Sequence, residues 1–519
     1  MKHLGRGGRS RLFAGMKLAG VSVVVAALIA GCAGAAAPSE SAAPTPSGPQ
    51  ELRVALSALP TLNVMGTTGA AYGSTITVAT QLFDTLVVAT DDGEYVPSLA
   101  TEWVTEGDTW TFTLRDDAVF HDGTPVTAAD AKASLELIIA NKGTLANLFA
   151  GVASINAPDA TTLEIVTSRP MPDLIPNLTR IYVGPGDRIA DEAFWEAPVG
   201  SGPFQFESYN QGDRVVLTGN EDYWGGAPKL ERLELIQMLE AAPKVTALEA
   251  GDIDVLWNIP VDLTGRLKTN PEVVYDSIPS YNYYFMWFNN GREPFTDPLV
   301  RQALAEAVDV DSIVTNVLGD LGTPAVSAIP ATVPGAGENK DIPYDPENAK
   351  KLLAEAGFPD GFSTTMEMNP GMGMNIDLIA RAMISDWAKV GITVELLEKE
   401  AAVFNEDFRN NNYDLHIQPN QVITGDAAYA TDRLYNCERV AASINHCYEE
   451  LDKLIKDARV EMDPAERSAI FEEANQFLWE NYVGIYQADV KYDYAVRSNV
   501  QGFVMPPSAT PRFDQTYIG

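Results

Sequence analysis

The sequence has little positive charge, and this limits the partners that the protein can have. Its 519 residues include 36 Lys and Arg against 71 Asp and Glu, for a formal net charge of −35. A field of that sign disfavours the phosphate backbone of nucleic acids and anionic lipid surfaces. We therefore expect no nucleic-acid partner.

The sequence also lacks the short motifs that announce common catalytic sites. It contains no G-x-x-x-x-G-K-[ST] phosphate loop, no H-E-x-x-H helix and no G-x-S-x-G elbow. Among its few histidines, His121, His416 and His446 each fit a turn or strand position better than a ligand position. Carboxylates are plentiful, but sequence alone cannot place two of them at the separation that a glycosidase needs. We expect no catalytic residue, no cofactor and no metal.

Long apolar runs are absent except for a short one near the amino end. The run from Leu18 to Gly31 has 14 residues, whereas a spanning helix needs about 20. Basic residues precede it, and small residues close it at Ile29-Ala30-Gly31-Cys32. This arrangement predicts a secretory signal peptide over residues 1–31.

The end of this leader resembles the lipobox of bacterial lipoproteins, in which cleavage falls just before a cysteine that carries lipid. The resemblance implies lipidation of Cys32; the alternative is a plain signal peptide followed by an incidental cysteine. Residues 32–50 are almost all Ala, Pro, Ser, Thr and Gly, so we expect a flexible tether. The exported body would be held at the outer face of the cytoplasmic membrane, on the periplasmic side if the cell has an outer membrane.

Cysteine is otherwise confined to Cys437 and Cys447. Export to an oxidising space favours a disulfide between them, which would stabilise the fold by about 2–3 kcal/mol in the chain-entropy picture. Two free thiols or a metal pair is the alternative. The chain after the leader is well beyond the ~250–300 residues at which single cores stop growing, so at least two lobes are expected.

Helix-start signals recur along the chain. Three segments open with Asp at the N-cap and Pro at the first helical position, at Asp297, Asp345 and Asp463. A fourth helix is predicted from Thr127, with Asp130 completing a capping box and Gly143 ending it. In the helix that follows Asp463, one face is predicted to pack on a core through Ile470, Ala474, Phe477 and Leu478.

Strand signals lie between these helices. The segment WTFTLR alternates Trp110, Phe112 and Leu114 with polar residues, the period of a half-buried strand. Further strands are predicted at ELRVALSALP, TTLEIVT, DRVVLTG, LERLELIQM, YNYYFMWFNN, ITVELLE and YDLHIQ. No period of 20–50 residues repeats. The sequence therefore predicts a mixed α/β fold and excludes a solenoid or propeller.

Several ordered segments resemble one family, the family 5 extracellular solute-binding proteins of ABC importers, the dipeptide, oligopeptide and nickel-binding group. The strongest match is Leu99 to Ile138, LATEWVTEGDTWTFTLRDDAVFHDGTPVTAADAKASLELI. Four more follow in the same order: VGSGPFQFESY with LTGNEDYWGGAPKLERLEL, FNNGREPFTDPLVRQALAEAVD, PYDPENAKKLLAEAGF, and ISDWAKVGITVELLE. The resemblance covers nearly all of residues 51–519.

The resemblance implies a two-lobe clamp of the periplasmic-binding-protein type, type II, in the large cluster with an extra subdomain in the first lobe. It implies a first lobe over 51–287 with an inserted subdomain at about 91–199, a second lobe over 288–486, and a return of 487–519 to the first lobe. The crossing segments are expected near YYFMWFNNG and YQADVKYDY.

The resemblance also implies a ligand surface between the lobes. On the first lobe it would be formed by Thr67, Thr68, Tyr72 and Gly73, and on the second by Met372, Met374, Phe404, Asp426 and Tyr429. The methionines belong to TTMEMNPGMGMN, in which Met366, Met368, Met372 and Met374 could instead form a soft-metal site. A loop whose thioethers adapt to core or ligand is the more common arrangement.

The sequence departs from the peptide-binding members at two places. They carry a W-x-G-D-x-x-D-P-D-like segment whose aspartate holds the ligand ammonium, and the matching stretch here is VITGDAAYATDRLY. Asp426 remains, but Ile423 stands in place of Trp and Tyr429 in place of the anchoring carboxylate, which leaves Asp432 as an alternative anchor. The loop Asn369–Asn375 lacks the Arg that meets the ligand carboxylate in some peptide binders.

The implied function is that of a monomeric, lipid-anchored protein that captures peptide or oligopeptide and delivers it to ABC permease subunits. A non-peptide solute, such as an oligosaccharide, an opine-like compound or a metal chelate, is the alternative within this class. A secreted, lipid-anchored hydrolase and a purely structural surface lipoprotein are the alternatives from other classes.

Overall fold

The structure is a computed structural model, and it describes residues 46, 48–58, 60–66, 73–90, 93–438 and 444–519. The predicted leader, the predicted lipidation site Cys32 and most of the predicted tether lie outside the described residues. None of the helices within the described ranges has both the length and the apolar character needed to cross a membrane.

The first part of the chain alternates strands with short helices. In chain order its elements are β1 (Glu51–Leu56), α1 (Ser74–Leu82), β2 (Val87–Ala89), β3 (Tyr95–Pro97), β4 (Ala100–Glu106), β5 (Thr109–Leu114), α2 (Ala128–Asn141), η2 (Thr144–Phe149), β6 (Val152–Asn156), β7 (Thr162–Thr167), α3 (Leu174–Leu178) and η3 (Glu192–Glu196). There follow β8 (Phe204–Asn210), β9 (Arg214–Gly219), β10 (Arg232–Gln237), α4 (Ala241–Ala250), β11 (Val255–Trp257), α5 (Val261–Lys268) and β12 (Val273–Phe288).

The second part has more helix. Its elements are α6 (Pro298–Glu306), α7 (Val310–Leu318), η4 (Gly319–Leu321), β13 (Gly322–Pro324), α8 (Pro346–Glu355), β14 (Ser363–Met368), α9 (Ile376–Ala388), β15 (Thr393–Glu398), α10 (Ala401–Arg409) and β16 (Leu415–Gln421). The chain ends with α11 (Ala427–Tyr435), α12 (Glu449–Ala458), α13 (Pro464–Glu480), β17 (Gly484–Arg497), β18 (Val500–Gln501) and β19 (Tyr517–Ile518).

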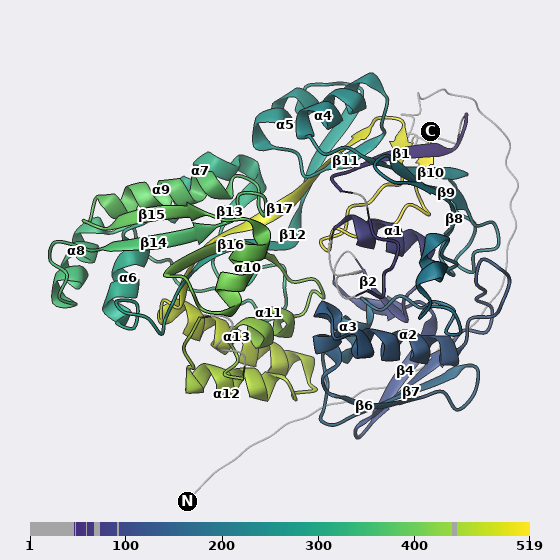
Figure 1. Cartoon of the computed structure of the whole chain (residues 1–519), viewed down its shortest axis with the longest axis horizontal. Helices are drawn as coiled ribbons and strands as arrows, with labels where there is room; N and C mark the ends of the chain where they lie inside the picture. The colour runs from purple at the N-terminus through teal and green to yellow at the C-terminus, as the bar shows by residue number, and fades with distance from the viewer. Residues whose placement is uncertain (1–45, 47, 59, 67–72, 91–92, 439–443) are drawn as a thin grey trace, which may run out of the picture. The chain divides into compact units, whose positions relative to one another are not determined.

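One large sheet runs through both parts of the chain. Its strand order is β15-β14-β16-β12-β17-β11-β1-β10-β9-β8, and β13 pairs with β17. The two longest strands, β12 and β17, pair antiparallel along their lengths in its middle (Figure 1). The segments expected to cross between the lobes fall on these two strands. Strand β12 pairs with β16 from the second part of the chain, and β17 pairs with β11 from the first part, so the two strands connect both parts of the sheet.

A separate four-stranded sheet, β4-β5-β7-β6, lies within the range predicted for the inserted subdomain. Its strand β5 buries Trp110, Phe112 and Leu114 and leaves the intervening residues more exposed, which confirms the predicted alternation. Figure 1 shows α2 beside this sheet, and α2 packs on β6 and β7.

The predicted helix starts are confirmed by their hydrogen bonds. Asp297, Asp345 and Asp463 each accept a hydrogen bond from a backbone N–H of the following turn, with Pro at the start of the helix. Thr127 and Asp130 form the predicted capping box. The other end of that helix differs from the prediction, because the left-handed C-cap is Lys142, with φ 53°, and not Gly143.

The core face of α13 is only partly as predicted. Ala474 and Leu478 are buried, but Ile470 and Phe477 are only partly so, while Phe471 and Trp479 are buried. The helix is therefore rotated about its axis relative to the prediction, so that Phe471 and Trp479 are more deeply buried than Ile470 and Phe477. Periodicity sets the width of the apolar face, whereas the neighbours against which it packs set its centre.

His416 lies in the middle of an aromatic cluster on β16. Its side chain is fully buried, its ring is stacked on Phe404 with centroids 4.1 Å apart, and Phe408 and Tyr413 lie against it. Burial lowers the pKa of His416 to about 3, with Lys399 lowering it further and Asp407 opposing the shift. The imidazole is therefore neutral in the folded protein at every moderately acidic pH.

We expect this buried imidazole to make the protein less stable in acid. In the unfolded chain it takes up a proton below about pH 6.5, whereas in the folded chain it does so only near pH 3. The unfolded state thus binds more protons between these values, and by pH 5 the free energy of unfolding falls by about 2 kcal/mol. His416→Phe should lose about 2 kcal/mol less than the unchanged protein between pH 7.5 and pH 5, as measured by denaturant unfolding. Equal losses in the two proteins would contradict this prediction.

Candidate functional site

Three adjoining cavities follow β12 and β17. Cavity A, of about 250 Å³, is lined by α1, β2, the loop after α3, β12, the loop before α11 and the C-terminal segment 502–515. Cavity B, of about 110 Å³, is lined by the ends of β1, β11 and β16, the start of α1 and residues 508–510. Cavity C, of about 520 Å³, is lined by β12, β17 and the loop 371–375.

The cavities share wall residues and so form one cleft. Ser508 and Thr510 line both A and B, and Asn258 and Tyr492 line both B and C. Its walls come from segments that are hundreds of residues apart in the sequence. We refer to cavities A, B and C together as the cleft.

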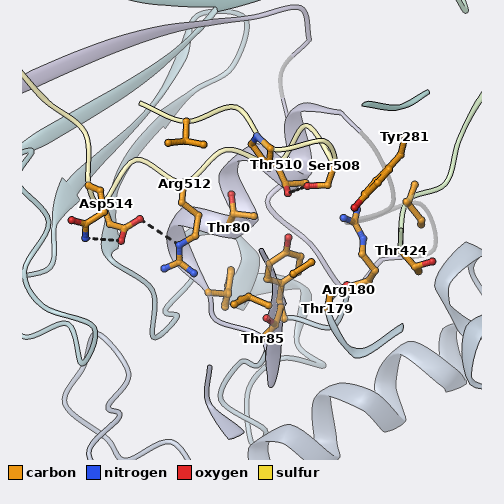
Figure 2. A pocket seen from close by; sticks show the side chains of 18 of the residues that line it. Thr80, Thr85, Thr179, Arg180, Tyr281, Thr424, Ser508, Thr510, Arg512 and Asp514 are labelled. Carbon is orange, nitrogen blue, oxygen red and sulfur yellow. Dashed lines mark hydrogen bonds and ion pairs between the residues drawn. The ribbon is translucent and has the colours of Figure 1, made fainter. Parts of the chain in front are cut away.

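Cavity A combines hydroxyl groups with two guanidinium groups. Figure 2 shows Arg180 beside Tyr281 and Thr424 on one side, and Arg512 with Asp514 on the other. Further hydroxyls come from Thr80, Thr85, Thr179, Ser508 and Thr510. Arg180 is only 5% exposed. A buried guanidinium among hydroxyl groups is suited to binding a carboxylate, which accepts charge-assisted hydrogen bonds.

The second guanidinium, Arg512, is held by the protein itself. It donates to the Tyr223 hydroxyl at 2.8 Å and lies 3.6 Å from Asp84 and 3.4 Å from Asp514. Asp84 also accepts hydrogen bonds from Tyr223 and Ser201. Arg512 therefore fastens the C-terminal segment to the start of the fold, and it is a structural residue of the cavity wall.

Basic residues outnumber acidic ones among the described residues of the cleft wall, whereas acidic residues outnumber basic ones in the chain as a whole. Among the described residues the cleft lining includes three basic residues, Arg180, Arg512 and Lys491, and two acidic ones, Asp493 and Asp514, whereas the chain has about twice as many acidic as basic residues. Burial raises the pKa of Asp493 to about 6, so this carboxyl group loses its negative charge in mildly acidic conditions. The cleft is thus the place where this acidic protein can accept an anionic group.

Some of the predicted ligand residues lie on the cleft. Gly73 lines cavity B, with φ 65° in the left-handed region, and Met372 and Met374 line cavity C. Thr67, Thr68 and Tyr72 lie outside the described residues.

The alternative of a soft-metal site is not supported. Met366 and Met368 are fully buried in the core around β14, while Met372 is 39% exposed. The four sulfur atoms are therefore divided between core and cleft. The described residues also hold no group of three His, Cys, Asp or Glu side chains placed to bind a metal ion.

Asp426 lines a different cavity and is already paired. Its two carboxylate oxygens accept hydrogen bonds from Arg467 at 2.6 and 2.8 Å, and it caps α11 by accepting from Ala428 N at 2.9 Å. The alternative anchor, Asp432, lies 3.3 Å from Arg459. The structure thus gives no support to either aspartate as the anchor for a ligand ammonium group, because each negative charge is balanced by an arginine.

Tyr429 and Phe404 also lie away from the cleft walls described above. Tyr429 is 5% exposed with the Arg433 guanidinium 4.8 Å from its ring centre, and Phe404 is fully buried against His416. Both side chains contribute to packing, so their positions do not support the prediction that they contact ligand.

The cavity that contains Asp426, cavity D, lies where segments from both parts of the chain meet. It has a volume of about 430 Å³, and its walls include Trp103 and Trp110 from the four-stranded sheet and Phe471 from α13. Near it the Tyr95 hydroxyl donates to the Thr424 carbonyl at 3.1 Å. The Asp426–Arg467 pair therefore joins the start of α11 to α13, in the cavity wall that these helices share with the inserted sheet.

The analysis of the sequence missed Arg180, Lys491 and the C-terminal lining. Arg180 lies in the apolar stretch NLTRIYVGP, and a basic residue there is the single local signal of a buried guanidinium. Lys491 and residues 508–514 belong to no motif. Their place in the cleft follows from the path of β17 and of the segment after it.

Cys437 and Cys447 lie with their Cα atoms 5.0 Å apart. This separation is within the range that a disulfide requires.

Comparison with known proteins agrees with the fold. A family model described as bacterial extracellular solute-binding proteins, family 5 Middle, matches residues 94–442. The glutathione-binding protein GsiB of Shigella boydii serotype 4 is 27% identical over 431 residues, covering 79% of this chain and 83% of the relative. The dipeptide-binding protein of Escherichia coli K12 is 25% identical over 463 residues, covering 82% and 86%.

A solved structure extends the likeness to three dimensions. The binding protein AgaA of A. tumefaciens R10, in complex with agropinic acid, has a TM-score of 0.76 and 28% identity, covering 90% of this chain and 99% of that one. This confirms the predicted two-lobe periplasmic-binding-protein fold. Since the family model matches more than half of the sequence, the chain belongs to the family 5 bacterial extracellular solute-binding proteins.

Proposed function

We propose that the protein is the solute-binding component of an ABC importer and that it captures a small, peptide-like solute with at least one carboxylate. The observation that carries this proposal is the excess of basic residues along the cleft of a strongly acidic chain. Within cavity A, Arg180 would bind the carboxylate, and the hydroxyls of Tyr281 and Thr424 beside it would accept or donate further hydrogen bonds.

Peptide is the first choice of solute because two relatives are named for glutathione and dipeptide binding. A small non-peptide acid of the opine type is the second candidate, since AgaA is bound to agropinic acid. The pairing of Asp426 and Asp432 with arginines favours this second candidate, because a peptide ammonium would need another partner. A neutral oligosaccharide would make no use of the positive charge in the cleft.

Capture would work by closure and not by chemistry. A solute in the cleft touches side chains from both parts of the chain, and a ligand that contacts both sides of a clamp stabilises its closed form. The permease would then recognise the closed form and receive the solute unchanged. This mechanism requires no catalytic residue, in contrast to the secreted hydrolase considered above.

We further propose that the mature protein begins at a lipidated Cys32, remains at the outer face of the cytoplasmic membrane as a monomer, and contains the Cys437–Cys447 disulfide. Intact-mass analysis of protein isolated from cell membranes tests these points. We expect a mass that corresponds to residues 32–519 plus lipid, with two hydrogens fewer than the reduced form. A full-length, unlipidated chain in the membrane fraction would contradict the anchor.

Mass spectrometry of the solutes released by denaturing the purified protein tests the function itself. We expect one or a few small compounds that carry a carboxylate, in amounts comparable with the protein. Recovery of neutral sugars would contradict the proposed solute class. Chemical alteration of an added solute during incubation would contradict a role in binding alone.

A further inference from the structure

The wall of cavity C contains one basic residue, Lys491. Lys491 lies on β17 and is only partly exposed. Among the residues that the structure describes, it forms no ion pair. The rest of the cavity wall is mixed: the amides of Asn258, Asn282 and Asn375 lie among apolar side chains such as Met372 and Met374.

Asp493, the acidic residue of the same cavity, is hydrogen-bonded to other groups of the protein. Asp493 accepts hydrogen bonds from Ile259 N at 3.0 Å and from the Tyr275 hydroxyl at 3.3 Å. Its carboxylate is 2% exposed, whereas the Lys491 side chain remains accessible from the cavity. Among the described residues no acidic group neutralises the Lys491 ammonium, so it is available to an anionic group of a solute in cavity C.

A polar group lies where cavity C meets cavity B. Asn258 is exposed and lines both cavities, and within the described chain its side-chain amide forms no hydrogen bond. Its backbone adopts the left-handed conformation, with φ 56°, which costs a residue other than glycine about 1 kcal/mol or more. The amide is thus available to a solute that passes from one cavity to the next.

We infer that cavity C is a second anion-binding subsite of the cleft, centred on Lys491, and that the solute therefore carries two anionic groups. One group binds near Arg180 in cavity A and the other near Lys491 in cavity C, with the narrow cavity B between them. The solute class is accordingly a dicarboxylic compound, such as an acidic dipeptide or tripeptide. This inference rests on the proposed function and specifies its substrate.

Matched pairs of probes that differ by one charge test the inference. Ala-Glu and Ala-Gln have nearly the same shape, as do glutarate and its monoamide, but the first member of each pair has an additional carboxylate. A hydrogen-bonded contact to a charged group is worth about 1.5–3 kcal/mol, so we expect the protein to bind at least one dicarboxylate about 10–100 times more tightly than its amide. The measurement is isothermal titration calorimetry at low ionic strength.

The variant Lys491→Met should remove this preference, so that the dicarboxylate and its amide bind with about equal affinity. Lys350→Met is the matched control, because Lys350 is an exposed residue of α8 whose ion pair within the described residues is with Glu347. The control should retain the preference. Circular dichroism and the melting temperature of both variants establish that they are folded.

Three results would overturn the inference: equal affinity for dicarboxylates and amides, a preference that survives Lys491→Met, or failure of both dicarboxylates to bind. Mass spectrometry of the native solute distinguishes failure of this inference from failure of the proposed function. A released solute with a single anionic group would overturn the second subsite and leave the importer role intact. A protein that releases no solute and binds none would count against both.

Discussion

Replacing Arg467 with methionine is expected to lower the free energy of unfolding by about 3–5 kcal/mol, because it leaves a buried carboxylate without its counter-charge. Asp426 is 9% exposed and receives two hydrogen bonds from Arg467. It also lies near Asp173, a second acidic group whose pKa is raised by burial and by Asp426 itself. Denaturant unfolding at pH 7.5 measures the change.

A second substitution identifies the cause of that loss. Asp426→Asn in the Arg467→Met background removes the uncompensated charge while keeping an oxygen that can cap α11, so most of the lost stability should return. Arg381→Met is the control, since the Arg381–Glu398 pair is exposed and such pairs contribute about 0–1 kcal/mol. If the single and double variants are equally unstable, the loss comes from packing of the arginine and not from charge.

Replacing Arg180 with glutamine is expected to weaken binding of the native solute by roughly 30-fold to several thousand-fold. Removing one member of a buried, hydrogen-bonded charge pair costs about 2–5 kcal/mol, and Arg180 is the guanidinium of cavity A that is not held by Asp84 and Asp514. Titration calorimetry with the solute identified by mass spectrometry gives the dissociation constants.

Glutamine retains part of the side-chain length and a hydrogen-bond donor, so the comparison isolates the charge. Thr179→Val, at the neighbouring position of the same cavity wall, is the matched variant and should weaken binding by tenfold or less, the effect of losing one neutral hydrogen bond of about 1 kcal/mol. If Arg180→Gln binds the solute as tightly as the unchanged protein does, the carboxylate does not lie in cavity A.

The candidate site could be predicted only where the signal was a local motif. Gly73, Met372 and Met374 were placed by segments that resemble the family, and all three line the cleft. Asp426 was selected by the same reasoning, but its carboxylate is turned to Arg467, which is 41 residues further along the chain. A motif can locate a loop near a ligand, but it cannot show which way a side chain points when a partner arrives from another element.

Local structure followed from the sequence by itself. The caps at Asp297, Asp345 and Asp463, the capping box at Thr127 and the alternation in β5 depend on hydrogen bonds and burial over a few residues, and these interactions are the same in any fold. The acidic charge and the family were also readable, because each is a property of composition or of ordered motifs. The limit of local reasoning appears at the ends of elements, where Lys142 and not Gly143 terminates α2.

The tertiary structure alone decided which charged groups line the cleft and what surrounds them. Arg512 and Arg180 look alike in the sequence, yet contacts with Asp84, more than 400 residues away in the chain, bind the first into the wall, while the second lies against the hydroxyls of cavity A. Lys491 and Asp493 are two residues apart on β17 and line the same cavity, but Asp493 accepts hydrogen bonds from Ile259 N and the Tyr275 hydroxyl, whereas Lys491 forms no ion pair within the described residues. The availability of a charged group depends on every neighbour that folding brings to it, and those neighbours come from segments whose distance along the chain carries no information about their distance in space.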